Sequence, residues 1–211
     1  MKKNFAIVGV GLIGGSLALK CRKNGLANRI IGVDNNQEHA LKALELGLVD
    51  EMMSLDEAVV AADVIVLAVP VGVLSKLLPH VLDMVSHQVV IDMGSTKSLL
   101  ANLVKDHPQR GRFVASHPMW GTEYSGPTAA VENAFEDKAV ILCDASDSDP
   151  DALAAATEIF ESLKMRIIEM GSNDHDLHAA YVSHISHITS FALANTVLEK
   201  EKEDDAIFEM A

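Results

Sequence analysis

The sequence predicts an α/β fold, with a doubly wound, mostly parallel sheet followed by the start of an all-helical second domain. Short β-branched runs alternate with helical patterns over the first 170 residues, as expected for parallel strands joined by crossover helices. Residues 64–69 are apolar on both faces of the predicted strand, which is typical of a central strand covered by helices on both sides. The pattern changes at Gly171, beyond which a long helical segment begins.

Each element of the predicted sheet layer follows from a local pattern. The strands are short runs rich in apolar and β-branched residues, at residues 5–8, 29–33, 64–69, 89–92, 113–115, 140–143 and 166–169. The helices repeat apolar residues every three to four positions, at residues 13–23, 37–46, 55–61, 73–85, 97–105 and 151–163. Because most strands are separated by helices, we expect an open sheet with helices on both faces.

A glycine-rich turn connects the first strand to the first helix. It reads Gly9-Val10-Gly11-Leu12-Ile13-Gly14, a G-x-G-x-x-G pattern. In this context the first glycine permits the tight turn, the second lets a pyrophosphate approach the backbone, and the third lets helix and strand pack closely. The helix N-terminus offers free N–H groups to the phosphates. We therefore predict a Rossmann-type dinucleotide-binding domain.

The acidic residue that accompanies this motif is Asp34, which ends the second strand 20 positions after Gly14. Its carboxylate can accept hydrogen bonds from an adenosine ribose diol and repels a 2′-phosphate. Asn35 and Asn36 stand where an arginine would be wanted for NADP, so NAD is the predicted cofactor. The predicted cofactor-binding residues are Gly9, Gly11, Leu12, Ile13, Gly14, Asp34 and Val69.

A long helix follows the predicted sheet. From Asp174 to about Lys200 the chain has no glycine or proline, and a helix of these 27 residues would be ~40 Å long at about 1.5 Å per residue. We divide the chain into a dinucleotide-binding domain, residues 1–170, and the first part of an incomplete helical domain for substrate binding and dimerisation, residues 171–211. The apolar stripe of this helix, which includes Leu177, Tyr181 and Ile188, is expected to pack on a second copy of the chain or on a further helical segment.

Composition narrows the possible partners. The chain has 17 basic and 30 acidic residues and a net charge of −13. This argues against nucleic acid and membranes, since nucleic acid and anionic lipid both attract a basic surface. A local positive pocket can still bind a small anionic substrate. The two cysteines, Cys21 and Cys143, are expected to be buried thiols in a reducing compartment.

The N-terminus imitates a secretory signal, because Met1-Lys2-Lys3 precede an uncharged run at residues 4–19. No Ala-x-Ala-like cleavage site follows, and the glycine pattern explains the run better. We therefore expect a cytoplasmic protein.

Two polar segments follow predicted strands, at the sheet edge where ligands of such folds bind. Ser95 lies in residues 92–97, and His117 lies in residues 116–127 with the only tryptophan. Four of the nine histidines lie on the long helix, in a segment of thirteen residues, 175–187. The alternative to a functional role is structural: His117 could hydrogen-bond a loop carbonyl, and His187 could be a packing residue. No H-E-x-x-H pattern or cysteine pair accompanies the histidines, so no metal site is predicted.

Three segments together make the chain resemble the prephenate dehydrogenases, NAD(P)-dependent enzymes of tyrosine biosynthesis. They are the glycine turn extended to Gly15-Ser16, the Gly94-Ser95-Thr96-Lys97 turn, and the His117-Pro118-Met119 run that continues through Gly121-Thr122-Glu123 to Ser125-Gly126. His175-Asp176 and the later Ser183-His184-x-x-His187 complete the likeness, which covers nearly the whole chain.

The resemblance implies NAD-dependent oxidative decarboxylation of prephenate to 4-hydroxyphenylpyruvate. By this likeness the catalytic residues are His117, which takes the proton of the ring hydroxyl, and Ser95, which bridges the hydroxyl or His117. The implied substrate-binding residues are Thr122, Glu123, Ser183, His187 and His175, the last as a support near the domain junction. The family forms dimers through its helical domain, so a homodimer is expected.

The chain departs from the family pattern at its end. The family's helical domain continues further and includes an arginine that binds a substrate carboxylate, for which this chain has no match, so we expect a C-terminally truncated form that is a poor catalyst alone. A β-hydroxyacid dehydrogenase would place a lysine on the long helix, and none occurs between Asp174 and Glu199. Arogenate as substrate, or a non-catalytic NAD-binding regulatory module, remain the alternatives.

Overall fold

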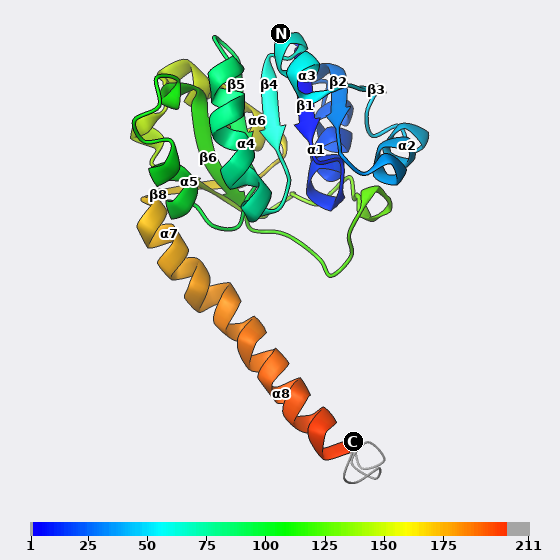
Figure 1. Cartoon of the computed structure of the whole chain (residues 1–211), viewed down its shortest axis with the longest axis vertical. Helices are drawn as coiled ribbons and strands as arrows, with labels where there is room; N and C mark the ends of the chain where they lie inside the picture. The colour runs from blue at the N-terminus through cyan, green and yellow to red at the C-terminus, as the bar shows by residue number, and fades with distance from the viewer. Residues whose placement is uncertain (1, 202–211) are drawn as a thin grey trace. The chain divides into compact units, whose positions relative to one another are not determined.

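A computed structural model describes residues 2–201 of the 211-residue chain (Figure 1). The chain divides into two compact units, Met1–His175 and Asp176–Ala211, which we describe separately. None of the helices within residues 2–201 combines the length and the apolarity that crossing a bilayer requires.

The first unit is built on one eight-stranded sheet with the strand order β3-β2-β1-β4-β5-β6-β7-β8. Its strands are β1 (Lys3–Val8), β2 (Ala27–Val33), β3 (Glu51–Met52), β4 (Val64–Leu67), β5 (Val89–Asp92), β6 (Phe113–Pro118), β7 (Ala139–Cys143) and β8 (Arg166–Met170). Neighbouring strands run parallel except for β6 and β7, which are antiparallel. The order reverses at β1 and β4, so the predicted doubly wound, mostly parallel sheet is confirmed.

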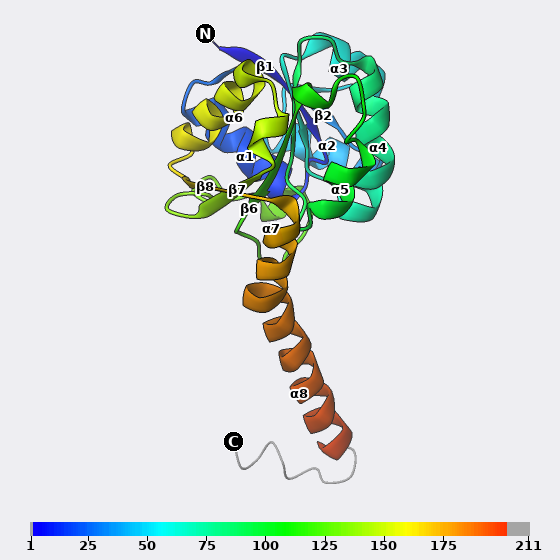
Figure 2. The ribbon, with the colours of Figure 1, turned by 90° about the vertical axis from the view of Figure 1, so that its left-hand side faces the viewer.

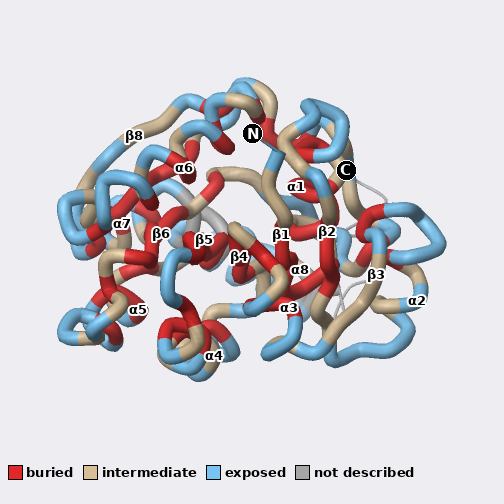
Figure 3. Tube along the Cα trace, turned by 90° about the horizontal axis from the view of Figure 1, so that it is seen from above, coloured by how far each residue is buried: buried red, intermediate tan, exposed pale blue. Residues whose placement is uncertain are grey.

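Helices cover both faces of this sheet, as Figure 2 shows. They are α1 (Leu12–Lys23), α2 (Gln37–Glu45), α3 (Leu55–Ala61), α4 (Val71–Met84), α5 (Ser98–Leu103) and α6 (Pro150–Ser162), with short 3₁₀ turns η1 (Arg110–Arg112), η2 (Pro127–Ala129) and η3 (Ala145–Asp147). One apolar core contains Leu17 of α1 and Phe160 of α6, and a second contains Leu78 of α4 and Leu100 of α5. Figure 3 shows the buried residues concentrated along the strands and the inner sides of the helices.

Both cysteines are buried thiols, as the sequence predicts. Burial raises the pKa of the Cys21 thiol to about 12, so this thiol stays protonated and unreactive at neutral pH.

The structure adds one strand to the predicted sheet and lengthens the strand that contains His117. Strand β3 was not predicted, because two residues at a sheet edge are too short to show a periodic pattern. The predicted strand 113–115 extends to Pro118, so His117 lies in β6 and not in the loop after it. The reason is antiparallel pairing with β7, in which His117 lies opposite Ile141 and Pro118 opposite Val140.

The long helix starts in the first unit and continues through the second. It consists of α7 (Ser172–Ala179), a π-helical turn η4 (Ala180–His184) and α8 (Ile185–Glu201). The predicted helix is confirmed, with a π turn inside it that apolar periodicity does not reveal. Large apolar side chains on it are exposed, including Tyr181, Ile188 and Phe191.

Candidate functional site

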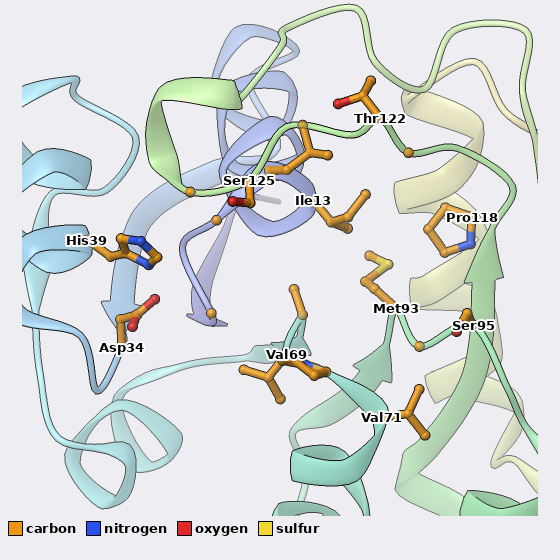
Figure 4. Close-up of a pocket in the computed structure, with 18 of the residues that line it drawn as sticks. Ile13, Asp34, His39, Val69, Val71, Met93, Ser95, Pro118, Thr122 and Ser125 are labelled. Carbon is orange, nitrogen blue, oxygen red and sulfur yellow. The ribbon is translucent and has the colours of Figure 1, made fainter. Parts of the chain in front are cut away.

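A cavity of about 640 Å³ lies at the carboxyl ends of β1, β2, β4, β5 and β6 (Figure 4). Asp34 and His39 lie at one side of it, and Ser95 and Pro118 lie at the other. The predicted cofactor residues Gly9, Gly11, Leu12, Ile13, Asp34 and Val69 line this cavity, and so do the predicted catalytic residues Ser95 and His117. The two groups of residues, far apart in the sequence, therefore border one continuous space.

The glycine turn has the shape that a dinucleotide pyrophosphate requires. Gly9 has a φ of +93°, a conformation that L side chains rarely adopt. A Cβ on Gly14 would lie 2.0 Å from the carbonyl oxygen of Gly9, so only glycine lets α1 start this close to β1. Gly14 thus shapes the turn without lining the cavity, while Gly11 leaves its backbone open to it. These features fit a bound NAD.

Backbone N–H groups hold the Asp34 carboxylate at the rim. Oδ2 accepts from the amide of Val10 at 3.1 Å, and Oδ1 accepts from the amide of Asn36 at 2.9 Å. Each oxygen keeps a lone pair for a ribose hydroxyl. The Asn36 side chain caps α2 by accepting from the amides of Glu38 and His39. The amides of Val10 and Asn36 therefore aim Asp34 at a ligand.

Sequence reasoning missed His39. It lies in the first turn of α2 and lines the cavity beside Asp34 (Figure 4). A Cβ on Gly126 would lie 3.4 Å from Nε2 of His39, so the imidazole nearly touches the backbone of the 120–126 loop. The contact joins residues 87 positions apart in the sequence, and no local pattern identifies it.

At the opposite end of the cavity, His117 contacts a second histidine that lies outside the cavity. Nδ1 of His117 lies 2.9 Å from Nε2 of His175, and the two rings meet edge to face. His117 is half-buried and lines the cavity, whereas His175 is only 2% exposed and does not line it. His175 is thus placed behind His117.

A buried ion pair joins the Ser95 turn to the strand that carries His117. Lys97 donates to the Asp92 carboxylate and, at 2.8 Å, to the carbonyl oxygen of Ser116. Asp92 Oδ1 accepts from the amide of Ser116 at 3.0 Å, and Oδ2 accepts from the amide of Gly94 at 2.9 Å. These bonds fix the ends of β5 and β6 relative to each other.

The loop that follows β6 borders the cavity with Trp120, Thr122 and Ser125. The Trp120 ring packs edge to face on Phe135, which is buried in the core. Glu123 lines an adjacent hollow and not the main cavity. Among the remaining predicted substrate residues, Ser183 and His187 lie on the helix of the second unit, and their side chains lie outside the described part of the structure.

Comparison with known proteins identifies both parts of the chain. The family model described as "Prephenate dehydrogenase, nucleotide-binding domain" matches residues 17–169, and the model described as "Prephenate dehydrogenase, dimerization domain" matches residues 171–211. The chain is 34% identical over 207 residues to the prephenate dehydrogenase of Bacillus subtilis (strain 168). That alignment covers 95% of this chain and 55% of the relative, so the chain spans about half of the relative's length.

Solved structures of related enzymes have a similar fold and a similar sequence identity to this chain. A prephenate dehydrogenase from A. aeolicus, in complex with hydroxyphenyl propionate and NAD+, superposes with a TM-score of 0.86 at 32% identity, covering 94% of this chain and 70% of that one. An arogenate dehydrogenase from Synechocystis superposes with a TM-score of 0.79 at 30% identity, covering 95% of this chain and 74% of that one.

Proposed function

The chain belongs to the prephenate dehydrogenase family, and from this premise we propose that it carries the NAD site and the catalytic base of an NAD-dependent enzyme that converts prephenate to 4-hydroxyphenylpyruvate and CO₂. One observation carries the proposal: the glycine turn and Asp34 share a single cavity with Ser95 and His117. The residues that would hold NAD and the residue that would act as base therefore border the same cavity.

NAD would be held by the residues already described. The glycine turn and the N-terminus of α1 would bind the pyrophosphate, and Asp34 would accept hydrogen bonds from the adenosine ribose. When bound, NAD supplies the hydride acceptor for the reaction. Asp34 favours NAD over NADP because its charge repels a 2′-phosphate and neither Asn35 nor Asn36 offsets that charge.

His117 would act as general base. Loss of hydride from the ring carbinol carbon leaves positive charge on the oxygen unless a base takes the hydroxyl proton, and an imidazole is suited to this near neutral pH. Nε2 of His117 would take that proton while Ser95 orients the hydroxyl. The C–C bond to the ring carboxylate then breaks, CO₂ leaves, and the bonding electrons make the ring aromatic. The proton held by His117 returns to the phenolate oxygen, so no net proton is released.

Arogenate is the second candidate substrate. It differs from prephenate in its side chain and undergoes the same ring chemistry, and the likeness to the Synechocystis arogenate dehydrogenase favours it. We further propose that the protein is cytoplasmic and forms a homodimer through its helical unit. The match of residues 171–211 to a dimerization domain and the exposed Tyr181, Ile188 and Phe191 support this assembly.

The direct experiment is a substrate assay on the full-length protein. NADH formation is followed by absorbance with prephenate and, separately, with arogenate, each with NAD and with NADP. We expect turnover with NAD and at least one of the two substrates, and the larger kcat/KM identifies the physiological one. Tight NAD binding without turnover of either substrate would instead support a regulatory NAD-binding module.

A further inference from the structure

We propose that His175 is a positioning residue that holds His117 in the tautomer with its hydrogen on Nδ1 and its lone pair on Nε2. The inference depends on the proposed base role of His117, but the tautomer itself can be measured without any turnover. The observation behind it is the 2.9 Å contact between Nδ1 of His117 and Nε2 of His175.

Two arrangements of hydrogen are compatible with this contact, because one nitrogen must donate and the other must accept. If His175 donates, neutral His117 carries its hydrogen on Nε2 and can only donate to a ligand from that atom. If His117 donates from Nδ1, its Nε2 has a lone pair and can take a proton. Only the second arrangement provides a base.

The second arrangement also survives the proton transfer. Once His117 has gained a proton at Nε2, its Nδ1–H still donates to the same lone pair of His175, and no hydrogen bond has to break. In the first arrangement Nε2 of His117 already carries a hydrogen, so the ring could gain a proton only at Nδ1. The new N–H would then face the N–H of His175, and the hydrogen bond between the rings would be lost. The contact is therefore compatible with catalysis in one direction only, from His117 to His175.

His175 is held firmly enough to serve this role. It lies in the first turn of α7, where its amide donates to the carbonyl oxygen of Gly171 at 2.9 Å. At the start of that turn, the amide of Ser172 donates to Oδ1 of Asp144 at 3.0 Å, and Ser98 Oγ donates to the carbonyl oxygen of Ser172 at 3.0 Å. The end of β7 and the start of α5 thus anchor the turn that presents His175.

The first test measures the tautomer of His117 by ¹⁵N NMR of the histidine rings, at a pH where the rings are neutral. Loss of one signal set in His117→Asn assigns the ring. We expect the Nδ1–H pattern in the unmodified protein and a gain of the Nε2–H pattern in His175→Leu. An unmodified protein with the Nε2–H pattern, or a tautomer that His175→Leu leaves unchanged, would overturn the proposal. His178→Leu, at an exposed position of the same helix, is the matched control.

The second test separates positioning from folding. His175→Leu is expected to lower kcat by ~10- to 100-fold, as loss of a group that orients a reacting side chain does, with KM and the Kd for NAD nearly unchanged. His175→Gln should restore most of kcat, because its amide oxygen can accept from Nδ1 of His117. Equal losses in both variants would contradict a role as acceptor.

A remote variant covers the case in which His175→Leu fails to fold. Asp144→Gly removes the acceptor of the Ser172 amide while suiting the positive φ of 49° at this position, and Asp144→Asn keeps both properties. We expect mixed tautomers of His117 in the glycine variant and the native tautomer in the asparagine variant. The native tautomer in both would contradict anchoring through α7. If the unmodified protein showed no turnover, the proposed function would be refuted. The NMR measurement of the His117 tautomer would still test the present inference.

Discussion

Asp92 and Lys97 form an ion pair in which neither side chain is exposed to solvent, beneath the turn that carries Ser95. The parallel pairing of β5 and β6 ends with Ile91 opposite Val114. Beyond that point, the side chains of Asp92 and Lys97 connect the two strands through Ser116. Through the amide and the carbonyl oxygen of Ser116, the ion pair fixes the residue before His117. The relative placement of Ser95 and His117 thus depends on two charged side chains, Asp92 and Lys97, that do not line the cavity.

Lys97→Met should destabilise the protein strongly. The substitution leaves the Asp92 carboxylate buried without its cation, which costs about 3–5 kcal/mol in comparable buried pairs. Urea unfolding measures the loss. The double variant Lys97→Met/Asp92→Asn removes both charges and should regain part of the stability, whereas Lys105→Met, at an exposed lysine just after α5, should have no effect. A change of under 1 kcal/mol for Lys97→Met would show that the pair does not have this structural role.

Gly14→Ala should abolish NAD binding. The added methyl group would lie 2.0 Å from the Gly9 carbonyl oxygen, so α1 must shift away from the turn that binds the pyrophosphate. Isothermal titration with NAD measures the effect. Gly72→Ala is the matched control, because this glycine lies in the first turn of α4 and an added Cβ would have no atom within 4 Å apart from its chain neighbours and its own helix backbone. Unchanged NAD affinity in Gly14→Ala would mean that the glycine turn is not the pyrophosphate site.

Asp34→Ala should narrow the preference for NAD over NADP by ~10-fold or more, equivalent to about 1.4 kcal/mol. The variant loses the acceptors for the ribose hydroxyls and also the charge that repels a 2′-phosphate. Titration with both cofactors checks this, with Asp56→Ala on the exposed side of α3 as a control. Tighter binding of NADP than NAD by the unmodified protein would contradict the assignment of Asp34.

The sequence predicted those parts of the fold and of the cavity that depend on residues close together in the chain. The glycine turn and the buried strands follow from residue type and spacing within a few positions, so the sheet and the cofactor end of the cavity could be predicted. The contact between His117 and His175 joins residues 58 positions apart, and the extension of β6 to Pro118 depends on pairing with β7. Neither leaves a periodic signal. Likewise, nothing in the sequence around His39 shows that its ring lies beside Gly126.

The central claim is that His117 is the base of an NAD-dependent dehydrogenation in this cavity. The most direct measurement is kcat for His117→Asn in the full-length protein, with the physiological substrate saturating, alongside the Kd of the same variant for NAD. The account predicts a kcat lowered by ~10²-fold or more, as expected for a lost general base. The Kd should be unchanged, because the substitution leaves the glycine turn and Asp34 intact. A variant that binds NAD normally and keeps a near-normal kcat would contradict it.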